Sequence, residues 1–362
     1  MQIAFDSNVF YKDPNLKGED WTLLEQFVQG RRPTVLLPQL VFEEVVNKVC
    51  ERLQSAYSKI KSEQREISSL TEKQYKLTNI KIPKERKAFE LRLHRRLREC
   101  RIQLLNYPAI THQDIVARDL SRRKPFAPDG EGRGYRDALI WHTLIEYLRD
   151  NPDDVCIFIT ENCSDFCSSR HETKVLHADL QADLDKARIK TKVQIRSSLA
   201  EFVAEFVKPT LKKLEDLRRS LTTGAPIRLK RYLETREQAV LDGVRSLDFP
   251  MTFPFDFEGV EITMLDGPLE IEVGDVYELN DKQAYIEFSG IYEADIDAYL
   301  RKTDVLGLDK TDRVNVTDWD WNEQYAEVGA SVILKVEFGL TYNQIKKRVV
   351  GFEVKDAAVI SA

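Results

Sequence analysis

The chain has 362 residues, of which 42% are hydrophobic and 31% are charged, and its formal net charge is −6 at pH 7. This length predicts two domains, and the composition is that of an ordinary soluble protein with room for a sizeable core. The apolar runs stay short of the roughly 18–20 residues that a membrane-spanning helix requires, so we expect a soluble protein.

The N-terminus begins MQIAFDSN and has no basic stretch followed by an apolar segment, so we expect no export signal and a cytoplasmic protein. The five cysteines are an odd number, which fits free thiols in a reducing compartment. Cys163 and Cys167 lie four positions apart, but no second pair of ligands follows nearby. We therefore favour loop and core roles for them over a zinc site.

Charge is unevenly distributed along the chain. From residue 245 to the end there are 11 Lys+Arg against 24 Asp+Glu, a net charge of −13, which leaves residues 1–244 at +7. Residues 45–105 alone hold 16 basic and 7 acidic residues, a net charge of +9. Such a segment attracts polyanions, although a solvated helix face with counter-charges elsewhere explains it equally well.

Short apolar runs alternate with helical patterns over the first 197 residues. The buried strands that we expect are residues 3–5, 34–37, 155–160 and 192–196. The helices that we expect between them include residues 21–30 and 138–148. Strands that alternate with helices predict an α/β three-layer sandwich with a central parallel sheet.

Two charged helices interrupt this alternation. The helical pattern continues from Val41 to about Leu77, Pro83 breaks it, and a second helix is expected from Lys84 to about Leu105. We therefore expect residues 45–105 to form a charged helical hairpin that is inserted into the α/β domain.

The pattern changes again in the last third of the chain. Residues 198–247 have helical spacing and are assigned to a helical linker. Beyond Phe249, apolar and polar residues alternate in segments such as 269–273, 284–288 and 332–338, which is typical of strands with one wet face. Residues 248–362 are therefore predicted to form an acidic, mainly antiparallel β-rich (α+β) domain.

Four acidic residues lie directly after or beside apolar runs of the first domain. They are Asp6 in IAFDSN, Glu44 in PQLVFEEV, Asp137 in GRGYRDALIW and Asp165 in FITENCSDF. Ligands of open α/β sheets bind outside the carboxyl ends of the strands, where crowded carboxylates favour a hard divalent cation. Each acid taken singly has another explanation, such as a helix cap, a turn or a surface charge. All four fall where one site could be built, so the sequence predicts a divalent-metal site there.

The same positions carry a resemblance to the PIN-domain nucleases, in order and in context. The matching motifs are Asp6-Ser7-Asn8, Pro38-x-x-Val41-x-x-Glu44, Gly-Tyr-Arg136-Asp137-Ala-Leu-Ile-Trp141 and Thr160-x-Asn162-x-x-Asp165-Phe166. The pattern is most similar to a bacterial PIN-like branch, and the last motif also resembles that of the ribonuclease toxins of toxin–antitoxin pairs. The resemblance covers residues 1–197, apart from the hairpin, and does not extend to the C-terminal domain.

The resemblance implies a metal-dependent nuclease that hydrolyses phosphodiester bonds with Mg²⁺ or Mn²⁺, with RNA favoured over DNA. It implies that Asp6, Asp137 and Asp165 bind metal directly and that Glu44 binds metal or positions its water. Glu43 in place of Glu44 stays open, because helix registers read from sequence err by a residue or two. Asn8 would hydrogen-bond within the site, and Thr160 and Asn162 would orient the edge that carries Asp165.

Basic residues are the candidates for contact with nucleic acid. Arg136, beside Asp137, could contact the scissile phosphate or form a structural ion pair. The basic residues of the hairpin that could follow a nucleic-acid backbone are Lys84, Arg86, Lys87, Arg92, Arg95, Arg96 and Arg98.

The leading hypothesis is therefore a Mg²⁺- or Mn²⁺-dependent endoribonuclease, by analogy a toxin or a phage-defence effector. One alternative is a catalytically silent PIN-like scaffold whose acidic C-terminal domain binds a protein partner, and another is a single-stranded DNA nuclease. The C-terminal domain could equally hold a homo-oligomer together. The four carboxylates favour the enzyme, because a scaffold has no reason to keep them together. A phosphatase of the haloacid-dehalogenase type would need an aspartate where Asn8 stands.

Overall fold

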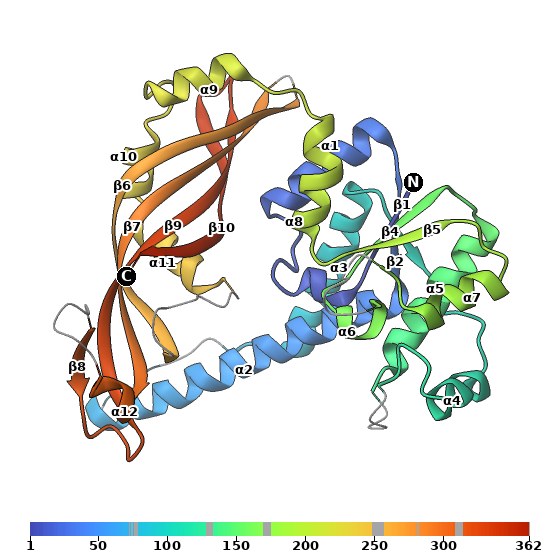
Figure 1. Ribbon diagram of the computed structural model, residues 1–362, viewed down its shortest axis with the longest axis horizontal. Coiled ribbons are helices and arrows are strands. Elements are labelled where there is room, and N and C mark those ends of the chain that lie inside the picture. The colour runs from blue at the N-terminus through green and yellow to red at the C-terminus, as the bar shows by residue number, and fades with distance from the viewer. Residues whose placement is uncertain are drawn as a thin grey trace. The chain divides into compact units, whose positions relative to one another are not determined.

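The computed structural model describes residues 1–71, 73, 75, 79–127, 133–168, 175–247, 257–280, 282–307 and 314–361. Residues 128–132, in the glycine-rich loop before Asp137, and the domain boundary predicted at residue 248 lie outside this range. The chain divides into two compact units, Met1–Thr210 and Leu211–Ala362 (Figure 1). Among the described residues, no helix combines the length and the apolar character needed to cross a membrane.

A five-stranded parallel sheet is the centre of the first unit. Its strands are β1 (Gln2–Phe5), β2 (Thr34–Pro38), β3 (Ile102–Leu105), β4 (Val155–Ile159) and β5 (Lys192–Arg196), in the order β3-β2-β1-β4-β5. Every residue of β1 is buried, and Figure 1 shows helices packed on both sides of the sheet. The predicted α/β sandwich with a central parallel sheet is confirmed. The chain reverses its direction of winding at β1, which has β2 on one side and β4 on the other, and ligands bind at such a switch point.

The helices of the first unit follow the predicted alternation. They are α1 (Glu19–Arg31), α2 (Gln39–Thr71), α3 (Ile82–Glu99), α4 (His112–Leu120), α5 (Tyr135–Asp150), α6 (Cys163–Phe166), α7 (Ala178–Lys186) and α8 (Leu199–Phe202), with the short segments η1 (Ser7–Phe10), η2 (Val203–Val207) and η3 (Lys208–Thr210). The longest of them, α2, has 33 residues and is therefore about 50 Å long.

The predicted helical hairpin is present as α2 and α3. The rings of Phe42 and His94 lie with their centroids 4.4 Å apart, and the Tyr57 hydroxyl donates to Asn79 Oδ1 at 3.4 Å, so the chain returns along the side of α2. The second helix was expected to reach Leu105, and this expectation is wrong. It ends at Glu99, Arg101 takes a left-handed conformation (φ 55°), and Ile102–Leu105 pairs with β2 as β3. The apolar run IQLL fits a helix or a strand, and the free edge of β2 decides between them.

The second unit is built on long antiparallel strands. They are β6 (Glu258–Asn280), β7 (Gln283–Arg301), β8 (Val314–Asp318), β9 (Tyr325–Asn343) and β10 (Arg348–Ser361), in the order β10-β9-β7-β6 with β8 paired to β9. The helices of this unit are α9 (Glu215–Thr222), α10 (Leu229–Glu234), α11 (Glu237–Arg245) and α12 (Lys302–Val305). The predicted separate, mainly antiparallel domain is confirmed.

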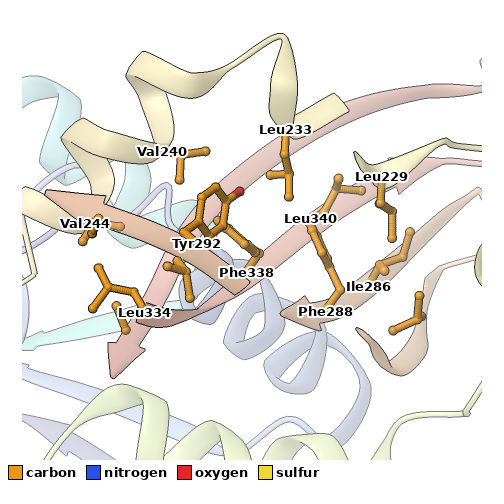
Figure 2. Close-up of a cluster of buried hydrophobic side chains, with 14 of the residues drawn as sticks. Leu229, Leu233, Val240, Val244, Ile286, Phe288, Tyr292, Leu334, Phe338 and Leu340 are labelled. Carbon is orange, nitrogen blue, oxygen red and sulfur yellow. The ribbon is translucent and has the colours of Figure 1, made fainter. Parts of the chain in front are cut away.

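One face of this second sheet carries the apolar core. Figure 2 shows side chains of α10 and α11, among them Leu233 and Val244, against Phe338 and Leu340 of β9 and Tyr292 of β7. The predicted linker, residues 198–247, is thus divided between the units: η3 closes the first, and α9 to α11 cover the second sheet. The helices pack there because a sheet with one apolar face must bury it.

Candidate active site at the carboxyl edge of the parallel sheet

Asp6 follows β1 directly and is held at the switch point of the sheet. Its backbone N–H donates to the Ile159 carbonyl at 3.0 Å, which ties it to the end of β4. Its carboxylate accepts hydrogen bonds from the Ser7 backbone N–H and the Thr160 hydroxyl, both at 2.6 Å, and from the Asn8 amide at 3.2 Å. Asp6 caps η1, so the helix-cap explanation also holds, but it is only 3% exposed and more tightly held than a cap requires.

Polar residues after β4 connect Asp6 to Asp137. The Thr160 hydroxyl, which donates to Asp6, also accepts a hydrogen bond from the Asn162 backbone N–H at 3.0 Å. The Asn162 side-chain amide donates to Asp137 Oδ1 at 3.2 Å, and its oxygen accepts the Ser164 hydroxyl at 2.9 Å. The two carboxylates, 131 positions apart in sequence, are thus joined through one short chain of hydrogen bonds.

Asp137 lies in the first turn of α5, where the helix dipole favours a negative charge. The N-cap residue directly before this helix is Gly134, whose φ is 111°. A Cβ atom at this position would lie 2.5 Å from the Pro125 carbonyl oxygen, so only glycine lets the start of α5 approach residues 125 and 126. This close approach sets the depth at which Asp137 enters the site.

The charges of the four predicted carboxylates act on one another. Burial raises the pKa of Asp137 to about 7, and the negative charges of Asp6 and Asp165 add to this effect. Burial also raises the pKa of Asp6 to about 6; the hydrogen bonds from Thr160 and Ser7 oppose the rise, and the charge of Glu44 adds to it. We call these four residues the carboxylate row and name them in the order in which their charges act on one another: Glu44, Asp6, Asp137, Asp165.

A cation is paired with each end of the carboxylate row. Arg136 Nη1 lies 3.2 Å from Glu44 Oε1, so the predicted phosphate contact at Arg136 is at present an ion pair. At the other end, Lys124 Nζ lies 3.6 Å from Asp165 Oδ1 and donates to the Ser164 carbonyl at 2.6 Å. Asp6 and Asp137, in the middle, have no ion pair with any described residue.

The middle of the row offers oxygen ligands of the kind that hard cations prefer. Over the described ranges, no group of three or more His, Cys, Asp or Glu side chains is arranged to hold a metal ion. Mg²⁺, however, usually keeps several waters and takes one or two carboxylates together with substrate phosphates. Asp6 and Asp137 meet that requirement, and beside them Asn8 Oδ1 is buried without a hydrogen-bond partner. The residues present therefore fit a hydrated divalent cation rather than a closed protein cage.

The geometry also distinguishes between the two adjacent glutamates of α2. Glu43 accepts the Tyr107 hydroxyl at 2.7 Å and the Gln39 amide at 3.0 Å, and so is occupied on another side of the helix. Glu44 is the residue whose charge acts on Asp6. It lies within the second turn of α2, on the side that faces Arg136.

Sequence analysis missed two residues beside the row. Tyr11 donates its hydroxyl to Ser7 Oγ at 3.0 Å, and burial raises its pKa, with further contributions from Glu44 and Asp6. Lys124 contacts Asp165 from a loop 41 residues earlier in the chain. Tyr11 could have been suspected from its position on the first loop after β1, whereas no pattern in the sequence marks Lys124.

The seven basic residues predicted on the hairpin separate into two groups. Arg86 pairs with Glu90 at 3.1 Å, and Arg96 pairs with Glu25 at 2.9 Å and donates to the Leu16 carbonyl. The other five are exposed, and none of them forms an ion pair with a described residue: Lys84, Lys87, Arg92, Arg95 and Arg98. Arg92 lies over the ring of Phe89.

Comparison with known proteins agrees with the architecture of the first unit. Residues 3–166 match the family model of the PIN domain, and this range contains all four residues of the carboxylate row. No curated protein sequence and no solved structure matches the chain. Residues 3–166 are therefore a PIN domain, a fold whose members are generally nucleases that use divalent metal ions, and this chain joins it to a separate β-rich unit.

Proposed function

We propose that this protein is a Mg²⁺- or Mn²⁺-dependent endoribonuclease that hydrolyses phosphodiester bonds at the carboxylate row. The observation that carries the proposal is the pair Asp6 and Asp137, two sheltered carboxylates whose pKa values burial raises, with the charge of Asp6 adding to the rise at Asp137. Burying like charges together is unfavourable unless a cation compensates them. A divalent ion at this position would turn an unfavourable pair into a binding site.

Each residue of the row has a separate task in this proposal. Asp6 and Asp137 would hold the cation, and Glu44 and Asp165, one on each side, would hold its waters or a second ion. When bound, the cation would lower the pKa of a water and stabilise charge on the phosphate. Thr160, Asn162, Ser7 and Asn8 fix the carboxylate oxygens through the hydrogen bonds described above. Because these donors are already in place, little reorganisation is needed when substrate arrives.

A basic stripe on α3 supports nucleic acid as the substrate. Lys84, Lys87, Arg95 and Arg98 are spaced by three, eight and three residues, so with the exposed Leu91 between them they share one helix face. The buried residues Phe89, Leu93 and Leu97 occupy the opposite face. The stripe is about 21 Å long, enough to follow the phosphates of about six nucleotides at helical spacing. The preference for RNA over DNA rests on the family resemblance, and a cytoplasmic location remains part of the proposal.

A second candidate function is a silent PIN scaffold whose acidic second unit binds a protein partner or a second copy of the chain. The observation that favours it is the pairing of Glu44 with Arg136 and of Asp165 with Lys124, because neutralised carboxylates need no metal. A nuclease for single-stranded DNA is the third candidate, and it would use the same residues. The experiment below distinguishes all three.

The test uses the full chain with end-labelled single-stranded RNA and single-stranded DNA, each in Mn²⁺, in Mg²⁺ and with chelator. The Asp6→Asn/Asp137→Asn variant is compared with Asp150→Asn/Asp154→Asn, which removes two exposed carboxylates from the amino edge of the same sheet. The proposal expects internal cuts in RNA that need metal, persist in the control variant and disappear in the first variant. Cuts in DNA alone would support the third candidate. A well-folded protein that cuts neither substrate would support the scaffold.

A further inference from the structure

The two cations at the ends of the carboxylate row differ in how they are sheltered. The Arg136 side chain is 73% exposed, whereas the Lys124 side chain is only 18% exposed and lies against α6. Its ammonium group contacts both the Ser164 carbonyl and the Asp165 carboxylate. Lys124 is therefore the cation that sits inside the site, and Arg136 is the one at its rim.

The backbone of Lys124 is held in place by a buried network of α4, α5 and α7. The Lys124 backbone N–H donates to Asp179 Oδ2 at 2.9 Å, and its carbonyl accepts two hydrogen bonds from Arg118. Arg118 in turn pairs with Asp183 at 2.6 Å, and Asp183 also accepts the Trp141 indole N–H at 3.0 Å. The main chain at Lys124 is thus fixed, whereas a lysine side chain has a flexible four-carbon stem through which the ammonium group can change partners.

Lys124 and a metal ion would compete for the same carboxylate. An ion that binds Asp165 takes up the negative charge that now attracts the ammonium group, and it repels that group as a like charge. The nearest new anion would be the phosphate that the same ion binds. An ammonium group on a fixed backbone beside a metal site is well suited to contact such a phosphate.

We propose that Lys124 is a substrate-binding residue whose ammonium group is paired with Asp165 in the absence of metal. Metal binding at Asp165 would then release the Lys124 ammonium group to the substrate phosphate. This inference rests on the proposed nuclease function, because it needs both a metal and a phosphodiester. It predicts that a single substitution of Lys124 raises the affinity for metal and lowers the metal-dependent affinity for nucleic acid. A purely structural lysine would weaken metal binding and nucleic-acid binding together, or neither of them.

The experiment measures the two binding steps separately in the full chain. Apparent Mn²⁺ affinity is measured without nucleic acid, from the rise in melting temperature across a metal titration. Affinity for labelled oligo(U) of 24 nucleotides is measured by fluorescence anisotropy, once with chelator and once with Ca²⁺ in place of Mn²⁺. The variants are Lys124→Met, Lys124→Gln and Lys124→Arg. The glutamine variant keeps a donor for the Ser164 carbonyl in case Lys124→Met folds poorly.

Lys12→Met is the matched control. Lys12 forms an exposed ion pair with Glu161 at 3.5 Å, one residue from Thr160, but it contacts no member of the carboxylate row. It therefore reports what the loss of one nearby positive charge does by itself.

The expected result for Lys124→Met and Lys124→Gln is a Mn²⁺ affinity raised by roughly threefold to fivefold, the range of a partly exposed ion pair. The gain in oligo(U) affinity on adding Ca²⁺ should fall by about tenfold, as expected for one charge-assisted phosphate contact, with little change in chelator. Lys124→Arg should keep most of that gain, and Lys12→Met should match the wild type in both measurements.

Two results would overturn the inference. If Lys124→Met and Lys124→Gln lower Mn²⁺ affinity or leave it unchanged, Lys124 does not compete with metal. If the Ca²⁺-dependent gain in oligo(U) affinity is the same as in the wild type, Lys124 does not contact the phosphate. Either of these results would leave the proposed nuclease function intact, provided that the wild type cleaves RNA. A wild type that neither responds to Mn²⁺ nor cleaves would refute the proposed function itself.

Discussion

The two sheets of this molecule differ in where their charged side chains lie. The three central strands of the parallel sheet have four or five residues and are buried on both faces, so polar groups gather where these strands end. The antiparallel sheet has main strands of 14 to 23 residues, with one face under α9 to α11 and acidic side chains such as Glu293, Asp297 and Glu337 on the other.

This difference appears in individual carboxyl groups. In the first unit, burial and the neighbouring carboxylates raise the pKa of Asp137 to about 7. In the second, a hydrogen bond from Lys213 lowers the pKa of Asp275. A parallel sheet thus concentrates negative charge at one edge, away from water, whereas the wet face of an antiparallel sheet spreads it out. The first arrangement favours chemistry and the second favours solubility or recognition.

The largest expected effect is on RNA cleavage, which should depend on a carboxylate of the first unit and not on one of the second. Asp137→Asn should reduce RNA cleavage by at least about a thousandfold, because it removes a ligand and a charge from the middle of the carboxylate row. Asp275→Asn, in the second unit, should leave cleavage unchanged. Initial rates with Mn²⁺ and the same labelled RNA measure both. Equal losses in the two variants would mean that catalysis does not reside at the edge of the parallel sheet.

The next effect is on the free energy of unfolding of the second unit, which depends on the apolar core of its sheet. Phe338 is 1% exposed, and its ring contacts those of Phe288, Tyr292 and Phe352. Phe338→Ala should lower the free energy of unfolding of the second unit by about 3–4 kcal/mol through lost burial and a cavity. Urea unfolding followed by tryptophan fluorescence measures this, since Trp319 and Trp321 lie in that unit. A change below about 1 kcal/mol would show that this ring is not central to the core.

The raised pKa of Asp137 predicts how stability depends on pH. Because its pKa is higher in the folded protein than in the unfolded chain, the folded state binds more protons between about pH 4 and pH 7, and stability falls as pH rises through this window. With chelator present, Asp137→Asn should therefore stabilise the protein by about 1–3 kcal/mol at pH 8 and have little effect at pH 4.

Thermal unfolding at the two pH values, with and without Mn²⁺, tests this prediction. Asp275→Asn is the control of opposite sign. Its lowered pKa means that the carboxylate stabilises the fold above the ordinary aspartate pKa, and that this contribution is lost as pH falls. If Asp137→Asn destabilised the protein at pH 8, Asp137 would be better explained as a structural partner of Asn162.

The smallest effect concerns the basic stripe on α3. Replacing Lys84, Lys87, Arg95 and Arg98 with glutamine should weaken oligo(U) binding and reduce the slope of log affinity against log salt by roughly 2–3, at about 0.7 for each lost phosphate contact. The control replaces four exposed cations of the same unit, Lys186, Arg188, Lys190 and Lys192. Anisotropy titrations at several salt concentrations measure both variants. Equal slopes in the two variants would show that general positive charge, and not the stripe, attracts the substrate.

Most of the architecture could be predicted from local patterns. Continuous apolar runs such as 155–159 indicate strands that are buried on both faces, and alternating runs such as 284–288 indicate strands with one wet face. The strand at 102–105 could not be predicted, because IQLL is too short to show a period. Its conformation depends on the edge of β2, which lies more than 60 residues earlier in the chain.

The residues of the candidate site likewise divide into those that could be predicted from the sequence and those that could not. Asp6 and Asp165 could be chosen because polar residues that follow parallel strands meet at one edge of the sheet, and Asp137 because it opens a helix. Lys124 could not be chosen, since its position depends on Arg118 of α4 and on Asp179 and Asp183 of α7, two helices that pack together. The same holds for Arg96, whose ion pair is with Glu25 of α1, whereas Arg86 pairs with Glu90 one turn further along its own helix.

The sequence by itself determined the two kinds of sheet, the hairpin and the four acidic candidates, because these follow from spacing along a single segment. Only the tertiary structure decided which carboxylates lie next to each other, which of them are paired with a cation and which charges remain open to solvent. The physical reason is that hydrophobic periodicity is a local property, whereas burial, ion pairing and strand neighbours arise between residues that meet only after the chain has folded.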